Sequence, residues 1–154
     1  MTVEQNIAAT RRLIDEGFNK GNLDVCDELV SSDAVENQRG SKPGIEGTKD
    51  TIRTLRNWFS DFELTIVDLI ASDDTVWFRN RATGVNTGSV LGRPPTGRTF
   101  DITFMDIVRF ADGKMSRLFS KPNSPDREAN CLCVADDGIW IGTRTGIFFA
   151  AGKP

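Results

Sequence analysis

A loop rich in proline and glycine separates two long runs that are suited to β-strands. Residues 88–98 (GSVLGRPPTGR) contain two prolines and three glycines, which exclude regular secondary structure from this segment. The flanking runs, 76–87 and 98–110, alternate apolar with polar side chains as strands do. The segment is therefore predicted to be an elaborate turn between two strands.

Two further strands extend this pattern. Residues 62–71 alternate in the same way and end at a tight turn over Asp73 and Asp74. The hairpin sequence ADGK at 111–114 predicts a returning strand at 115–121. The central part of the chain is thus predicted to be a meander of long antiparallel strands.

Helices are predicted to precede these strands. Thr2 and Gln5 have the spacing of a capping box, and apolar positions at helical spacing continue to Phe18, before Gly21 supplies a left-handed cap. A shorter helix follows Asn22, and a third helix begins at about Thr48. Between them, residues 34–38 are predicted to form a short strand.

Helices followed by a meander predict an α+β domain, in which a curved antiparallel sheet wraps around the N-terminal helices as a cone-shaped barrel. Such a sheet encloses a cavity, where small-molecule sites tend to lie. We assign residues 1–123 to this cone domain and 124–154 to a C-terminal extension. A core of ordinary size is expected for 154 residues.

The extension alternates like a β-hairpin over residues 130–149, with Asp137 and Gly138 as its turn. It resembles one repeat of a regulator-type β-propeller, but a single repeat cannot bury its own face. The hairpin could pack on the sheet, cover the cavity mouth, or pair with another protomer. We favour surface packing on the same domain.

Composition excludes several classes of function. A net charge of −3 with interspersed signs offers no basic surface for nucleic acid or an anionic membrane, and no apolar run is long enough to span one. The chain has no histidine and no tyrosine, which removes the commonest metal ligand and the Ser-His and Cys-His dyads. Three cysteines and the absence of a signal-peptide pattern predict a cytoplasmic protein with free thiols.

Four segments together carry a family resemblance: 19–24 (NKGNLD), 44–47 (GIEG), 87–98 (TGSVLGRPPTGR) and 106–114 (DIVRFADGK). Over residues 5–123 the chain resembles the SnoaL-like polyketide cyclases, within the cone fold of nuclear transport factor 2 and scytalone dehydratase. The resemblance implies an enzyme or binding protein with an apolar pocket and no cofactor or metal. It also implies a homodimer formed through the outer face of the sheet.

The chain departs from this family at its pocket positions. Where the family usually carries histidine, tryptophan or the catalytic aspartate, this sequence has Asn37, Asn80, Asn86, Leu118-Phe119 and Asn123. An asparagine can both donate and accept, so a converging set could bind carbonyl or enol oxygens. The resemblance therefore implies substrate-binding roles for Asn37, Asn80, Asn86, Phe119 and Asn123. Local turn chemistry is the alternative for Asn123, which lies between two prolines.

Asp106 is the predicted catalytic residue. It shares a strand face with Phe104 and Val108, and partial desolvation there would raise the pKa of its carboxyl toward a value useful for proton transfer. The alternative is a structural acid paired with an arginine or with backbone donors, which is the commoner role. On the preceding strand, Asn80 and Asn86 share one face, and Arg79 and Arg81 are expected to point the other way.

Aromatic residues complete the predicted site. Trp58, Phe78 and Phe104 are most simply core residues, and they are also predicted to line the pocket. Three functions remain open. The first is a cofactor-independent cyclase or isomerase that acts on a hydrophobic polyketide-like or terpenoid substrate. The second is a hydroxylase or epoxide-opening relative, and the third is a non-catalytic protein that binds a small ligand.

Overall fold

The computed structural model describes residues 2–36, 42–118, 129–135, 138–143 and 147–151. The chain divides into two compact units, Met1–Phe119 and Ser120–Pro154. No helix in the described ranges is long and apolar enough to cross a bilayer.

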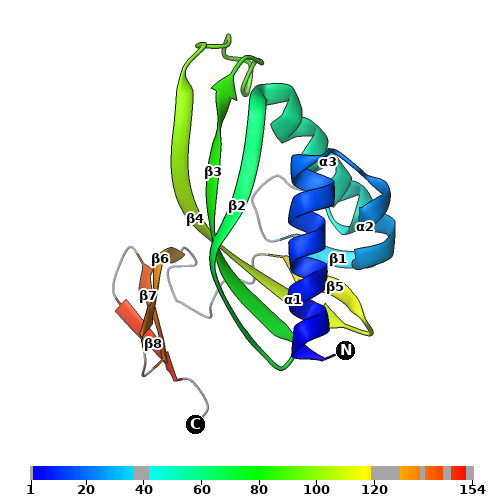
Figure 1. Ribbon diagram of the computed structural model, residues 1–154, viewed down its shortest axis with the longest axis vertical. Helices are drawn as coiled ribbons and strands as arrows, with labels where there is room; N and C mark the ends of the chain where they lie inside the picture. Colours follow the sequence, from blue (N-terminus) through cyan, green and yellow to red (C-terminus); the bar gives the residue numbers. More distant parts are fainter. Residues whose placement is uncertain (1, 37–41, 119–128, 136–137, 144–146, 152–154) are drawn as a thin grey trace. The chain divides into compact units, whose positions relative to one another are not determined.

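In its described residues, the first unit contains a five-stranded sheet with four helical segments on one side of it (Figure 1). Its strands are β1 (Val30–Glu36), β2 (Phe59–Ser72), β3 (Thr75–Asn86), β4 (Thr99–Ala111) and β5 (Lys114–Leu118). The spatial order is β1-β5-β4-β3-β2, with β1 parallel to β5 and the other neighbours antiparallel. The sheet is strongly curved and does not close, so the predicted α+β class is confirmed.

The first predicted helix consists of two different segments. The capping box is present, because Thr2 N–H donates to Gln5 Oε1 (2.8 Å) and Gln5 N–H donates to Thr2 Oγ1 (3.3 Å). α1 (Val3–Arg12) then passes into a π-helix, η1 (Leu13–Asn19), where a continuous α-helix was expected. A π turn uses the same residue types with a wider spacing, so apolar periodicity does not distinguish it over seven residues.

Two element boundaries differ from the prediction. After α2 (Asp24–Leu29), the chain enters β1 at Val30 rather than at residue 34. α3 (Gly44–Trp58) begins four residues before the predicted start. In the sequence, Gly44 and Gly47 suggest a loop. In the structure, backbone atoms of other residues lie so close to both glycines that a side chain would not fit. A Cβ at Gly47 would lie 1.8 Å from the carbonyl oxygen of Lys42.

The alternation along β3 is confirmed. Asn80 is fully buried and Phe78 is 4% exposed, on the face that packs toward the helices. Arg79 and Arg81 point the other way and form ion pairs with Asp68 and Asp101. The inner face of the sheet is therefore apolar except at a few positions, and the charges lie on its outer face.

Cys26 on α2 is a buried free thiol. Burial raises its pKa to about 11, and the positive charge of Lys49 offsets this only in part. At pH 8 we expect iodoacetamide to label Cys26 at least tenfold more slowly in the folded protein than in urea, because the thiolate is the reacting form. Peptide mapping of the labelled sites measures this. Labelling of Cys26 at the same rate in both states would contradict the burial.

The sign of the pH effect on stability follows from the same shift. The folded state favours the neutral thiol, so the stability that Cys26 contributes is complete below its pKa in the unfolded chain, about 8.5. It is lost as the pH rises toward about 11. The free energy of unfolding is therefore expected to fall over this window, and to fall less in Cys26→Ala.

The residues of the second unit that the structure describes form three antiparallel strands in the order β6-β7-β8: β6 (Ala129–Ala135), β7 (Gly138–Thr143) and β8 (Ile147–Ala151). The predicted hairpin thus belongs to a three-stranded sheet. Its predicted turn includes Asp137, which lies outside the described residues. Packing of this unit on the cone domain stays a prediction.

Candidate functional site

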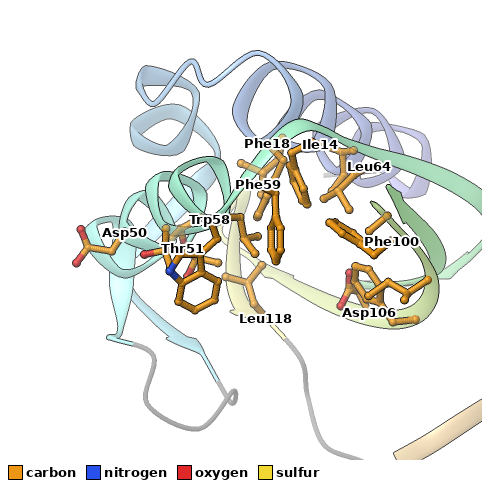
Figure 2. A pocket seen from close by; sticks show the side chains of 18 of the residues that line it. Ile14, Phe18, Asp50, Thr51, Trp58, Phe59, Leu64, Phe100, Asp106 and Leu118 are labelled. Atoms are coloured by element: carbon orange, nitrogen blue, oxygen red, sulfur yellow. The ribbon is translucent and has the colours of Figure 1, made fainter. Parts of the chain in front are cut away.

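A cavity of about 1080 Å³ opens between the helices and the concave face of the sheet (Figure 2). Figure 2 shows Phe100 and Asp106 on the sheet side of the cavity, with Ile14 and Phe18 of η1 across from them. Most of the lining is apolar. Besides these residues it includes Leu13, Leu55, Trp58, Phe59, Phe62, Leu64, Phe78, Phe104, Met115 and Leu118.

Aromatic rings form one wall of the cavity. Phe59 packs against Phe100 with ring centroids 4.6 Å apart, and it stacks on Phe62 at 6.3 Å. Trp58 meets Phe59 edge to face at 6.3 Å. These rings come from the end of α3 and from β2 and β4, so the wall exists only after the helix docks on the sheet. It offers flat apolar surfaces to a planar ligand.

Asp106 is the buried acid of this cavity. Its side chain lies on β4 between Phe104 and Val108, and the residue is only 7% exposed. Asn80 Nδ2 on β3 donates a hydrogen bond of 2.6 Å to Asp106 Oδ2. This bond from the neutral amide fixes the rotation of the carboxyl group.

Asn80 lies behind this carboxyl rather than on the cavity wall. It is fully buried, and the residues that line the cavity do not include it. Its Oδ1 accepts no hydrogen bond within the described part of the chain. A buried amide that is only half satisfied costs stability.

Most other polar groups of the cavity are already bonded. The hydroxyls of Thr10, Thr48 and Thr51 donate to backbone carbonyls one turn earlier in their own helices. The second carboxylate on the lining, Asp50, accepts from Lys42 Nζ at 2.7 Å, and both of these side chains are exposed. Asp106 is therefore the one buried carboxylate among the lining residues that the structure describes.

Asn86 organises the loop at residues 87–98. Its Nδ2 donates to the carbonyls of Trp58 (3.1 Å) and Gly88 (2.9 Å), and its Oδ1 accepts from the backbone N–H (2.9 Å) and hydroxyl (3.0 Å) of Thr96. Although Asn86 lines the cavity, these four bonds occupy its amide. Its position thus supports a structural role, and the predicted contact with substrate would need one of these bonds to break.

The structure brings together most of the predicted site residues that it describes. Asp106, Asn86, Trp58, Phe78 and Phe104 line the cavity, and Asn80 contacts Asp106 from behind. Asn37, Phe119 and Asn123 lie outside the described residues. The described part of the chain has no group of three or more acidic or cysteine side chains placed to hold a metal ion.

Sequence reasoning did not assign Phe100 to the site, although Phe100 lines the cavity. Phe100 could have been found by extending the alternation of Phe104 and Asp106 four residues toward the N-terminus. Phe59 was expected on the inner face of the third helix, and it begins strand β2 directly after α3 ends at Trp58. Its position depends on the crossing of α3 over the sheet.

The family model for SnoaL-like polyketide cyclases matches residues 8–118. The chain belongs to the SnoaL-like polyketide cyclase family. This match covers nearly all of the unit that contains the cavity. No protein of curated function matches the chain.

Solved structures share the fold of this SnoaL-like chain. A candidate SnoaL-like polyketide cyclase from Jannaschia sp. CCS1 is 27% identical, with a TM-score of 0.68 over 75% of this chain and 83% of its own. IdmH from Streptomyces antibioticus, a candidate polyketide cyclase, is 29% identical, with a TM-score of 0.62 over 74% and 88%. TsrD from Streptomyces laurentii is 24% identical, with a TM-score of 0.71 over 77% and 87%. Family membership supports a role of the cyclase or isomerase type.

Proposed function

We propose that this protein is a cofactor-independent cyclase or isomerase that acts on a hydrophobic, polyketide-like or terpenoid substrate. The observation that carries the proposal is the carboxylate of Asp106, which is buried on the wall of a large apolar cavity. The amide of Asn80 holds this carboxylate from behind. The SnoaL-like family and two candidate polyketide cyclases above 25% identity favour a carbonyl-rich substrate.

Asp106 acts as the base in the first step. Its carboxylate removes a proton from a carbon next to a carbonyl group, and the electron pair of that C–H bond moves into an enolate. The hydrogen bond from Asn80 holds the carboxyl in one orientation for this transfer. The apolar walls exclude water, so the enolate is not quenched from bulk solvent.

The enolate then has two outcomes. In a cyclase its carbon attacks a second carbonyl of the same molecule, a C–C bond forms, and the alkoxide takes the proton back from Asp106. In an isomerase the proton returns to a different carbon. Both outcomes leave the atom count and oxidation state unchanged and require no cofactor. The aromatic wall around Phe59 positions a planar substrate for either outcome.

Hydrogen exchange tests the proton transfer without knowledge of the natural substrate. A panel of neutral aryl 1,3-diketones and fused cyclic ketones is incubated with the protein in deuterated buffer, and NMR follows deuterium incorporation next to the carbonyl. We expect at least one compound to exchange faster than in buffer alone. A panel whose members bind but exchange at the buffer rate would contradict the proposed chemistry.

A non-catalytic binding protein is the second candidate. The observation that favours it is Asn86, whose amide is fully occupied by the loop and so offers no free polar group to a substrate. A ligand that co-purifies and is recovered chemically unchanged, together with no exchange in the panel, would support this alternative.

A further inference from the structure

The loop at residues 87–98, here called the mouth loop, is held rigidly at the rim of the cavity. The C-terminal end of the loop pairs with Asn86, the residue that precedes the loop, because Asn86 N–H donates to Arg98 O (2.9 Å) and Gly97 N–H donates to Asn86 O (2.9 Å). The N–H groups of Thr87 and Gly88 both donate to Trp58 O. Side chains of this loop therefore have defined positions beside the cavity.

Leu91 lies at the tip of the mouth loop in an unfavourable conformation. Val90 and Arg93 exchange two backbone hydrogen bonds of 3.1 and 3.0 Å, which leaves Leu91 and Gly92 as a two-residue turn with φ of 50° and 79°. Such turns select Asn, Asp or Gly at the first position. Leu91 is also 85% exposed and lines the cavity. A strained, exposed apolar side chain at a cavity rim indicates a missing contact.

Arg98 supplies the second observation. Four charged residues line the cavity: Lys42 is paired with Asp50, and Asp106 is buried deep in the sheet face. Within the described residues, the guanidinium of Arg98 takes part in no hydrogen bond or ion pair. The sheet arginines Arg79 and Arg81, in contrast, both have acidic partners.

We propose that the ligand of this cavity is an anionic amphiphile, whose apolar body fills the cavity and contacts Leu91 and whose carboxylate pairs with Arg98. A guanidinium binds a carboxylate with two parallel hydrogen bonds. Arg98 directly precedes β4 and is eight residues from Asp106, so their Cα atoms lie roughly 25 Å apart along an extended chain. The anionic group is thus remote from the carbon that reacts. The part of this inference that places the reacting carbon at Asp106 rests on the proposed function. The pairing of the carboxylate with Arg98 does not.

Paired probes test the inference by direct binding. Dansyl-labelled undecanoic acid and its methyl ester share one apolar body and differ in the charge at one end. We expect the protein to bind the acid roughly five- to tenfold more tightly than the ester, and we expect this ratio to fall as salt is added.

Two substitutions assign the effect to Arg98. Arg98→Gln is expected to bring the ratio close to one by weakening the acid alone. Arg93→Gln is the matched control, because Arg93 is exposed on the same loop and does not line the cavity, and it is expected to keep the ratio.

Leu91→Asn separates a binding role from a structural one. Asparagine suits the left-handed turn better than leucine, so the melting temperature should not fall. Both probes should nevertheless bind several-fold more weakly, because the apolar contact is lost. Unchanged affinity for both probes in this variant would overturn the role of Leu91.

The inference is overturned if Arg98→Gln keeps the ratio, if it weakens acid and ester equally, or if neither probe binds. These outcomes are independent of the exchange test, because the diketone panel is neutral and requires no partner for Arg98. Failure of exchange with a retained acid preference would overturn the proposed reaction and leave the ligand class supported.

Discussion

Asp106→Asn is expected to slow deuterium exchange and turnover by about 10²- to 10⁴-fold, the usual contribution of a positioned acid or base. The substitution keeps the size of the side chain. An amide oxygen in the same place can still accept the bond from Asn80, which is 2.6 Å long in the native protein. The free energy of unfolding should therefore change by no more than about 1 kcal/mol. Exchange rates by NMR and urea denaturation measure the two quantities.

Asp101→Asn is the control for this prediction. Asp101 lies on the same strand with an exposed side chain, and it pairs with Arg81 on the outer face of the sheet. Its replacement should leave exchange unchanged. Full exchange activity in Asp106→Asn would show that this carboxyl is not the base. An unfolded Asp106→Asn variant would instead favour a structural acid, the alternative that the sequence left open.

Asn19→Ala is expected to lower the free energy of unfolding by about 2–4 kcal/mol. The side chain of Asn19 pairs with edge strand β2 as another strand would. Its Nδ2 donates to Leu64 O (2.9 Å), and its Oδ1 accepts from Leu64 N–H (2.8 Å). Alanine would leave both backbone groups of a residue that is only 5% exposed without these partners. Phe18 and Leu64, next to this contact, both line the cavity, so ligand binding should weaken as well.

Asn22→Ala provides the matched control. Asn22 is an exposed asparagine three residues later, and its Oδ1 accepts one bond of 3.2 Å from the N–H of Asp24. Its loss should cost less than about 1 kcal/mol. Urea denaturation of both variants gives the comparison. Similar losses for Asn19→Ala and Asn22→Ala would mean that the contact with β2 does not stabilise the fold.

Local patterns were sufficient to predict much of the fold. The capping box at Thr2 and Gln5 predicted the start of α1, and alternation along β3 predicted that Asn80 faces inward while Arg79 faces outward. These features depend on residues within a few positions of each other, so sequence spacing contains them. The π-helical segment was not predicted, because its side-chain pattern over seven residues resembles that of an α-helix.

The amino-acid sequence alone determined that one acid, Asp106, shares an apolar strand face, and that a turn rich in proline must join the two central strands. Only the tertiary structure decided the partners of the site residues. Asn80 bonds to Asp106 across 26 positions of sequence, whereas Asn86, on the same face of the same strand, bonds to the mouth loop instead. The reason is physical: strand periodicity gives a side chain its direction, but the chain packed opposite decides which group it meets.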